Sequence, residues 1–89
     1  MDLTTVQDFF KNEIEKGNYE IVNFSAPTGL NLWIDILVLN RPFKIVVNEF
    51  KVEQNGDISE NYIQLGNFTQ QQHKTIYDRE KKRRIVRND

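Results

Sequence analysis

The stretch from Leu30 to Leu39 reads LNLWIDILVL and is the strongest β-strand signal in the chain. Successive residues of a strand point to opposite faces of a sheet. Every even-numbered position of this stretch is apolar, so that face is expected to lie in a core. The odd-numbered face mixes Trp33, Asp35 and Leu37 with other residues, and it gives the strand apolar side chains on both sides.

Further strands are predicted on both sides of this stretch. Residues 19–25 and 43–53 are rich in strand-forming residues. Asn55 and Gly56 follow, and an Asn-Gly pair between two strand-like runs favours a two-residue type I′ hairpin. That turn predicts a fourth strand, which continues to Leu65.

The loop after Leu39 decides which side chains share a face with the core. A three-residue loop at 40–42 gives one continuous apolar face, whereas a two-residue loop would flip the next strand relative to its neighbour. The sequence favours the three-residue loop for that reason. The core predicted on this basis consists of Leu32, Ile34, Ile36, Val46, Phe50, Ile63 and Leu65.

Helices are predicted at both ends of the chain. Residues 3–16 carry an apolar stripe at helical spacing, and Gly17 accepts the left-handed conformation that often follows a helix. A second helix is predicted over 68–86, where Thr69 precedes a glutamine at capping-box spacing. The predicted fold is a single α+β domain over residues 1–89: helix, four-stranded antiparallel meander and C-terminal helix (α-β-β-β-β-α), with helix packing on a single layer of sheet.

Charge is divided between an acidic body and a basic end. Residues 1–73 carry ten acids and five bases, whereas residues 74–89 carry seven bases and three acids. The segment 78–87 is expected to project as a helix end. It is either simply solvated, or it contacts an acidic protein surface or nucleic-acid phosphates. The residues predicted to make such contacts are Arg79, Lys81, Lys82, Arg83, Arg84 and Arg87.

The second candidate site is the sheet face opposite the predicted core. A small domain is not expected to leave a large apolar patch in water, so a helix, a second copy of the chain or a target protein should cover it. Aromatic side chains supply much of the binding energy at interfaces, which makes the tryptophan and a nearby tyrosine the expected anchors. The predicted protein-binding residues are Trp33, Leu37, Ile45, Val47 and Tyr62.

Residue types that perform catalysis are sparse in this chain. It has one histidine, His73, and no cysteine, and it has neither a zinc motif nor a glycine-rich phosphate loop. We therefore expect no enzyme activity, no cofactor and no metal. The enzymatic alternative is a small ribosome-dependent RNase toxin that uses His73, Tyr77, Arg79 and Arg83. The acidic body counts against it, because such domains usually have a strongly basic body.

The expected location is cytoplasmic. The absence of cysteine fits a reducing compartment. The N-terminus lacks the basic-then-apolar pattern of a signal peptide. The longest apolar run, 36–39, is far shorter than a membrane span.

In its small size, its Asn/Lys/Ile-rich composition and its lack of a catalytic motif, the whole chain resembles small inhibitors encoded by phages and mobile elements, anti-CRISPR proteins among them. No specific motif carries this resemblance, so no site residue follows from it. It implies a non-enzymatic protein-binding module that inhibits or regulates a larger, nucleic-acid-handling protein or ribonucleoprotein complex. The alternative is binding of RNA or single-stranded DNA through the basic C-terminal helix.

Overall fold

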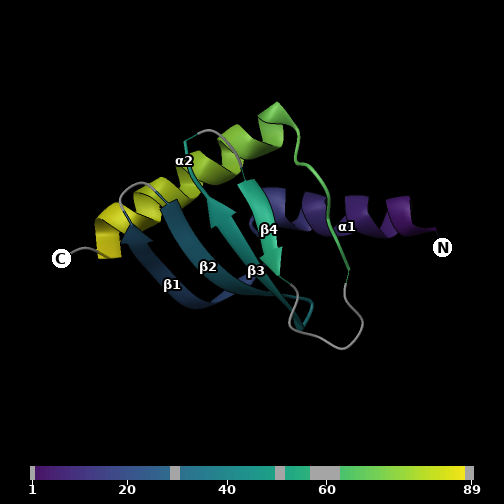
Figure 1. Cartoon of the computed structure of the whole chain (residues 1–89), viewed down its shortest axis with the longest axis horizontal. Coiled ribbons are helices and arrows are strands. Elements are labelled where there is room, and N and C mark those ends of the chain that lie inside the picture. The colour runs from purple at the N-terminus through teal and green to yellow at the C-terminus, as the bar shows by residue number, and fades with distance from the viewer. Residues whose placement is uncertain (1, 29–30, 50–51, 57–62, 88–89) are drawn as a thin grey trace.

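The chain folds into one antiparallel sheet with two helices packed on a single face of it. A computed structural model describes residues 2–28, 31–49, 52–56 and 63–87. The elements are α1 (Leu3–Lys16), β1 (Glu20–Thr28), β2 (Asn31–Val38), β3 (Arg41–Val47), β4 (Val52–Gly56) and α2 (Gln70–Arg87). The strands lie side by side in the order β1-β2-β3-β4, and α1 and α2 pack on the same side of them (Figure 1).

The predicted α-β-β-β-β-α layout is wrong in its second half, where the last strand was expected after an Asn-Gly hairpin, whereas β4 ends at that Gly56. Three of the four segments predicted as strands contain strand structure, and the described residues of the fourth, 63–65, form none. Residues 57–62 lie outside the described part of the chain. The predicted strand 43–53 is interrupted, since β3 ends and β4 begins within it. Gly56 pairs with Lys44 inside β4, so Asn-Gly is not a turn here: strand pairing overrides the local turn preference.

The loop between β2 and β3 has two residues, and the three-residue loop predicted at this point is also wrong. Val38 pairs with Arg41, and the intervening Leu39 and Asn40 have φ angles of 50° and 65°. Both are left-handed values, as a type I′ turn requires. A leucine rarely adopts this conformation, so the sequence around Leu39 does not suggest such a turn.

The shorter loop reverses the predicted faces of β3. Ile45 pairs with Ile34, Val47 pairs with Leu32, and both β3 residues are 0% exposed. Val46, predicted for the core, is buried at 7% exposed, but it lies on the opposite face of the sheet beside Trp33. The buried core that results consists of Ile14, Leu32, Ile34, Ile36, Val38, Phe43, Ile45, Val47, Val52, Leu65 and Ile76. Ile63 packs against this core, and the predicted core residue Phe50 lies outside the described residues.

Both helix boundaries that the sequence predicted from local signals are confirmed. Gly17 has a φ of 84°, and its N–H donates to the carbonyl of Ile14 at 3.1 Å, which closes the end of α1. At the start of α2, the Thr69 hydroxyl accepts from the Gln72 N–H at 3.1 Å. The Gln72 side chain accepts from the Thr69 N–H at 3.0 Å. This reciprocal pair is a capping box, and it fixes where α2 begins.

Candidate binding surfaces

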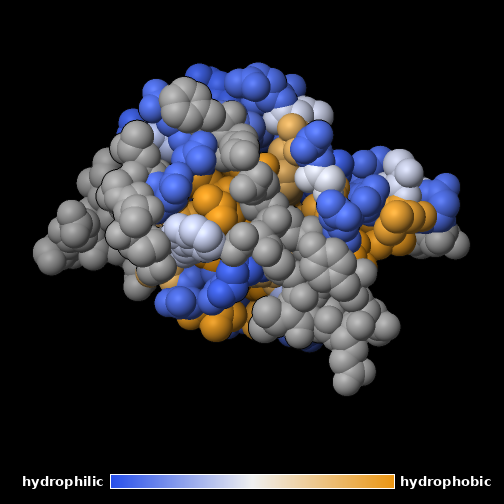
Figure 2. Space-filling view, in the orientation of Figure 1, coloured by the Kyte–Doolittle hydropathy of each residue, from blue (hydrophilic) through white to orange (hydrophobic). Residues whose placement is uncertain are grey.

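The sheet face turned away from the helices carries a set of apolar side chains. Trp33 and Leu37 of β2 lie there half-buried, opposite Val46 and Pro42 of β3. Val22, at an irregularity in β1, is 62% exposed. We call this surface the outer sheet face. Figure 2 shows that the α2 edge of the molecule is hydrophilic, whereas hydrophobic atoms gather lower down, over the sheet.

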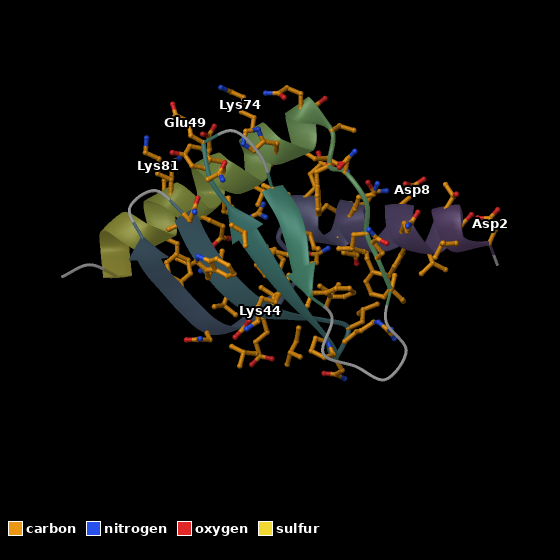
Figure 3. The ribbon with its side chains drawn as sticks, viewed as in Figure 1. Asp2, Asp8, Lys44, Glu49, Lys74 and Lys81 are labelled. Carbon is orange, nitrogen blue, oxygen red and sulfur yellow. The ribbon has the colours of Figure 1, made fainter. Side chains whose placement is uncertain are left out.

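The outer sheet face contains a small cavity of about 180 Å³. Next to it, the Lys44 Nζ lies 3.5 Å from the Asp35 Oδ1. Figure 3 shows Lys44 at the lower part of the sheet, well below α2. An apolar hollow beside an ion pair can accept one apolar side chain of a partner and orient it by charge. The lining residues are Val22, Asp35, Ile36, Leu37, Pro42, Phe43 and Lys44.

The five residues predicted to bind protein do not lie together. Trp33 and Leu37 are on the outer sheet face, as expected. Ile45 and Val47 are in the core beneath the helices, so the prediction of their face was wrong. Tyr62 lies outside the described residues. Val22 was missed, because its place at a strand irregularity leaves no pattern in the sequence.

Glu80 of α2 is a carboxylate with 0% exposed surface, and it is the centre of a polar cluster. The Tyr19 hydroxyl donates to its Oε2 at 2.5 Å. The Arg83 Nε donates to its Oε1 at 2.7 Å, and the Arg79 Nε approaches Oε2 at 3.5 Å. A buried charge is tolerated only when it is paired and hydrogen-bonded, and these three partners supply that pairing. We call Tyr19, Arg79, Glu80 and Arg83 the Glu80 cluster.

Arg79 also joins α2 to the end of α1. Its guanidinium donates to the carbonyls of Ile14 at 2.6 Å and Glu15 at 2.7 Å, and to the Tyr19 hydroxyl at 3.0 Å. The last carbonyls of a helix have no partner within the helix, and positive charge is favoured at that end. Arg79 therefore caps α1, and most of its hydrogen-bonding capacity is used inside the protein.

The Glu80 cluster shifts the ionisation of its members. Burial and the hydrogen bond to Glu80 raise the pKa of Tyr19 to about 12, although Arg79 opposes the shift. The hydrogen bond to Glu80 also raises the pKa of Arg83. At neutral pH Tyr19 is therefore a neutral phenol that donates a hydrogen bond.

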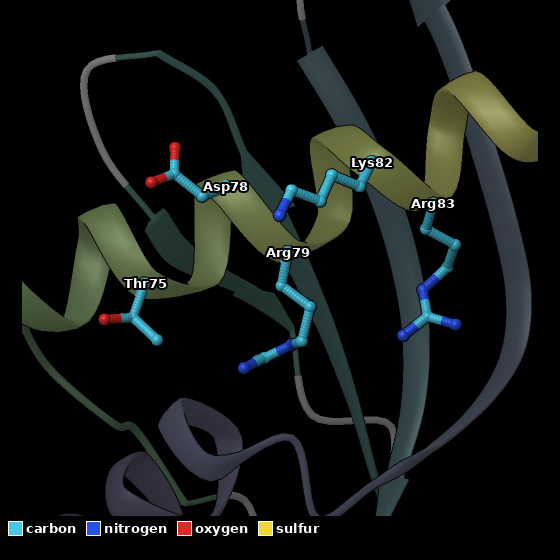
Figure 4. A pocket seen from close by; sticks show the side chains of 5 residues that line it. All are labelled: Thr75, Asp78, Arg79, Lys82 and Arg83. Atoms are coloured by element: carbon cyan, nitrogen blue, oxygen red, sulfur yellow. The ribbon is translucent and has the colours of Figure 1, made fainter.

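A cleft of about 730 Å³ runs along α2, on the side of the helix that carries Arg79 (Figure 4). In that view Arg79 and Arg83 extend from the helix on the side where α1 lies, whereas Asp78 and Lys82 extend from its other side. We call this hollow the α2 cleft. Its lining residues are Thr75, Asp78, Arg79, Lys82 and Arg83.

The residues predicted to make charged contacts have different surroundings. Arg79 and Glu80 are bonded to the end of α1 and to Tyr19, so α2 is held against the body at least as far as Glu80. Arg83 is bonded to Glu80 within the same helix. Lys81 and Lys82 are exposed, and the Lys81 Nζ lies 5.8 Å from the centre of the Tyr77 ring. The other two, Arg84 and Arg87, are within α2, but their side chains lie outside the described part of the structure.

The four residues of the RNase alternative do not converge on one site. His73 is 6% exposed, and its Nε2 lies 3.0 Å from the carbonyl oxygen of Asn48, at the end of β3. Its ring is 6.1 Å from that of Tyr77. Arg79 instead contacts the last carbonyls of α1, so the guanidinium groups and the histidine serve different parts of the fold.

Comparison with known proteins finds no matching family model, no similar curated protein and no similar solved structure. Among the described residues, no three His, Asp or Glu side chains are grouped closely enough to hold a metal ion. In the same residues, no helix has the length and apolar character needed to cross a membrane.

Proposed function

We propose that the chain is a non-enzymatic protein-binding module that regulates or inhibits a larger partner by occupying one of its surfaces. The observation that carries this proposal is the position of both helices on one face of the sheet. On the other face, Val22 is 62% exposed, and the cavity there has largely apolar walls. Exposed apolar surface around a hollow is typical of a protein interaction site.

The size of the cavity favours a protein partner over a small molecule. Pockets for drug-sized ligands measure roughly 300–1,000 Å³, whereas this one is about 180 Å³. It fits a single aliphatic side chain from a protein surface. Charges around that side chain on the partner would meet Lys44 and Asp35, so they would set its orientation more than its affinity.

Site-specific photo-crosslinking in the native host tests this proposal. A photoreactive residue at Val22 is compared with the same residue at Leu3, on α1. Both side chains are 62% exposed, so the two probes have equal access to solvent. We expect a discrete crosslinked protein from position 22 and none from position 3. Equal crosslinking at both positions, or none at 22, would refute binding through the outer sheet face.

A further inference from the structure

We infer that the α2 cleft binds the phosphodiester backbone of a nucleic-acid strand. The α2 cleft and the outer sheet face share no lining residue, so this inference does not depend on the proposed function. Three cations, Arg79, Lys82 and Arg83, line the cleft from neighbouring turns of the same helix. A phosphate backbone is the polyanion that such an arrangement fits, because its charges also repeat along a line.

Arg83 retains donors that the fold does not use. A guanidinium has five N–H donors, and the Nε and one Nη of Arg83 face Glu80. Its side chain is 41% exposed, so the remaining N–H groups can reach a ligand in the cleft. A planar fork of N–H donors matches two oxygens of one phosphate, which a lysine ammonium cannot do.

Glu80 prepares Arg83 for this contact. Because the carboxylate is buried and immobile, its bond to the Arg83 Nε at 2.7 Å restricts the long arginine side chain before any ligand arrives. Binding then costs less side-chain entropy than it would for a free arginine. Glu80 also cancels part of the positive charge of Arg79 and Arg83, so each single phosphate is attracted weakly. The affinity for a nucleic-acid strand is therefore expected to depend on contacts with several phosphates.

The other polar groups of the cleft extend the contact. Lys82 provides an exposed ammonium group, and Thr75 provides an exposed hydroxyl one turn before Arg79. Asp78, which also lines the cleft, repels phosphate, so the affinity of the cleft for a single free anion is expected to be low. In the sequence, Arg84 and Arg87 add two more cations to the same helix.

Recognition at this site should be independent of base sequence. Among the described residues, no aromatic side chain lines the cleft, and Tyr77 lies beside Lys81 and His73 instead. Without a ring on which bases can stack, we expect the contacts to go mainly to the backbone. The affinity should then fall steeply as salt rises.

Fluorescence anisotropy with labelled oligouridine and oligothymidine of the same length tests the inference. Lys82→Gln is compared with Lys81→Gln, its neighbour in the sequence, which loses the same charge outside the cleft. We expect Lys82→Gln to weaken binding by about tenfold at low salt and to reduce the salt slope by about one. Lys81→Gln should change affinity by less than about threefold, because it affects only the general field of the helix.

Three results would overturn the inference: no binding of either oligonucleotide at low salt, equal losses in the two variants, or equally tight binding of polyglutamate. The last would identify an acidic protein as the ligand. Both lysines are exposed, so their substitution should leave the melting temperature unchanged and keep the comparison free of folding effects. Tighter binding of oligouridine or of oligothymidine distinguishes RNA from DNA as the natural strand.

Discussion

Glu80 is the residue on which the position of α2 depends most. Replacing Glu80 with alanine leaves Arg79, Arg83 and Tyr19 without their shared acceptor. Removing a hydrogen-bonded charged partner typically costs about 1–3 kcal/mol, and the two arginines left behind are 26% and 41% exposed, so they stay partly solvated. We expect a loss of that order in the free energy of unfolding, measured by urea denaturation. Asp78→Ala is the control, since this exposed acid on the same helix should change stability by less than about 0.5 kcal/mol. Similar losses in the two variants would show that the Glu80 cluster is not a stability determinant.

Gly17 is the second residue whose identity the structure requires. Its φ is 84°, and a Cβ added there would lie 3.4 Å from the Arg79 guanidinium carbon. Gly66 has a similar φ of 77° but nothing within 4 Å of such a Cβ. Both Gly→Ala variants should lose about 1–2 kcal/mol from the left-handed backbone. Gly17→Ala should lose more in thermal or urea unfolding, because its Cβ would be at the near limit of van der Waals contact with Arg79, which hydrogen bonds to α1 hold in place. An equal loss would mean that the Arg79 contact adjusts without cost.

At the scale of elements, the Tyr19–Glu80 hydrogen bond couples the start of β1 to α2. The pKa of Tyr19 is raised from 10.0 to about 12, so folding favours the neutral phenol. The corresponding stability is fully present below pH 10 and is lost as pH rises through about 12. The free energy of unfolding should therefore fall by roughly 2 kcal/mol more in the wild type than in Tyr19→Phe between pH 9 and 12. Parallel pH profiles for the two proteins would contradict the coupling.

The strands show which features a sequence can predict. The alternation in β2 correctly placed Leu32, Ile34 and Ile36 in the core, because strand periodicity is a local property. The faces of β3 were predicted wrongly, since they depend on a tight turn at Leu39 whose left-handed φ no sequence signal indicates. The turn predicted at Asn55 was also wrong, because this part of the chain pairs with β3 as strand β4.

The polar contacts between elements were the part that the sequence could not reveal. Tyr19 and Glu80 are 61 positions apart, and only the folded chain brings them together. The basic run of α2 was recognised as a charged segment. However, the docking of the helix decides the role of each charge: Arg79 caps α1, whereas Lys82 faces solvent. Composition therefore indicated where charge gathers, and the fold decides which of the charges are available.

At the scale of the whole molecule, the two candidate surfaces are separate. The outer sheet face is on the side of the sheet away from the helices, and the α2 cleft lies along one of those helices. The two proposed ligands, a protein and a nucleic-acid strand, would therefore not compete for the same residues. Such a division suits a small regulator of a larger complex that contains both.

The most direct test of protein binding through the outer sheet face is a titration of the crosslinked partner, once isolated, with three forms of the chain. These are the wild type, Val22→Asp and Leu3→Asp. The side chains of Val22 and Leu3 are each 62% exposed, so the two substitutions are matched in exposure. A charge placed in an apolar interface should weaken binding by about tenfold or more for Val22→Asp, while Leu3→Asp binds as the wild type does. Unchanged affinity of Val22→Asp, or equal losses in both variants, would contradict the proposed interface.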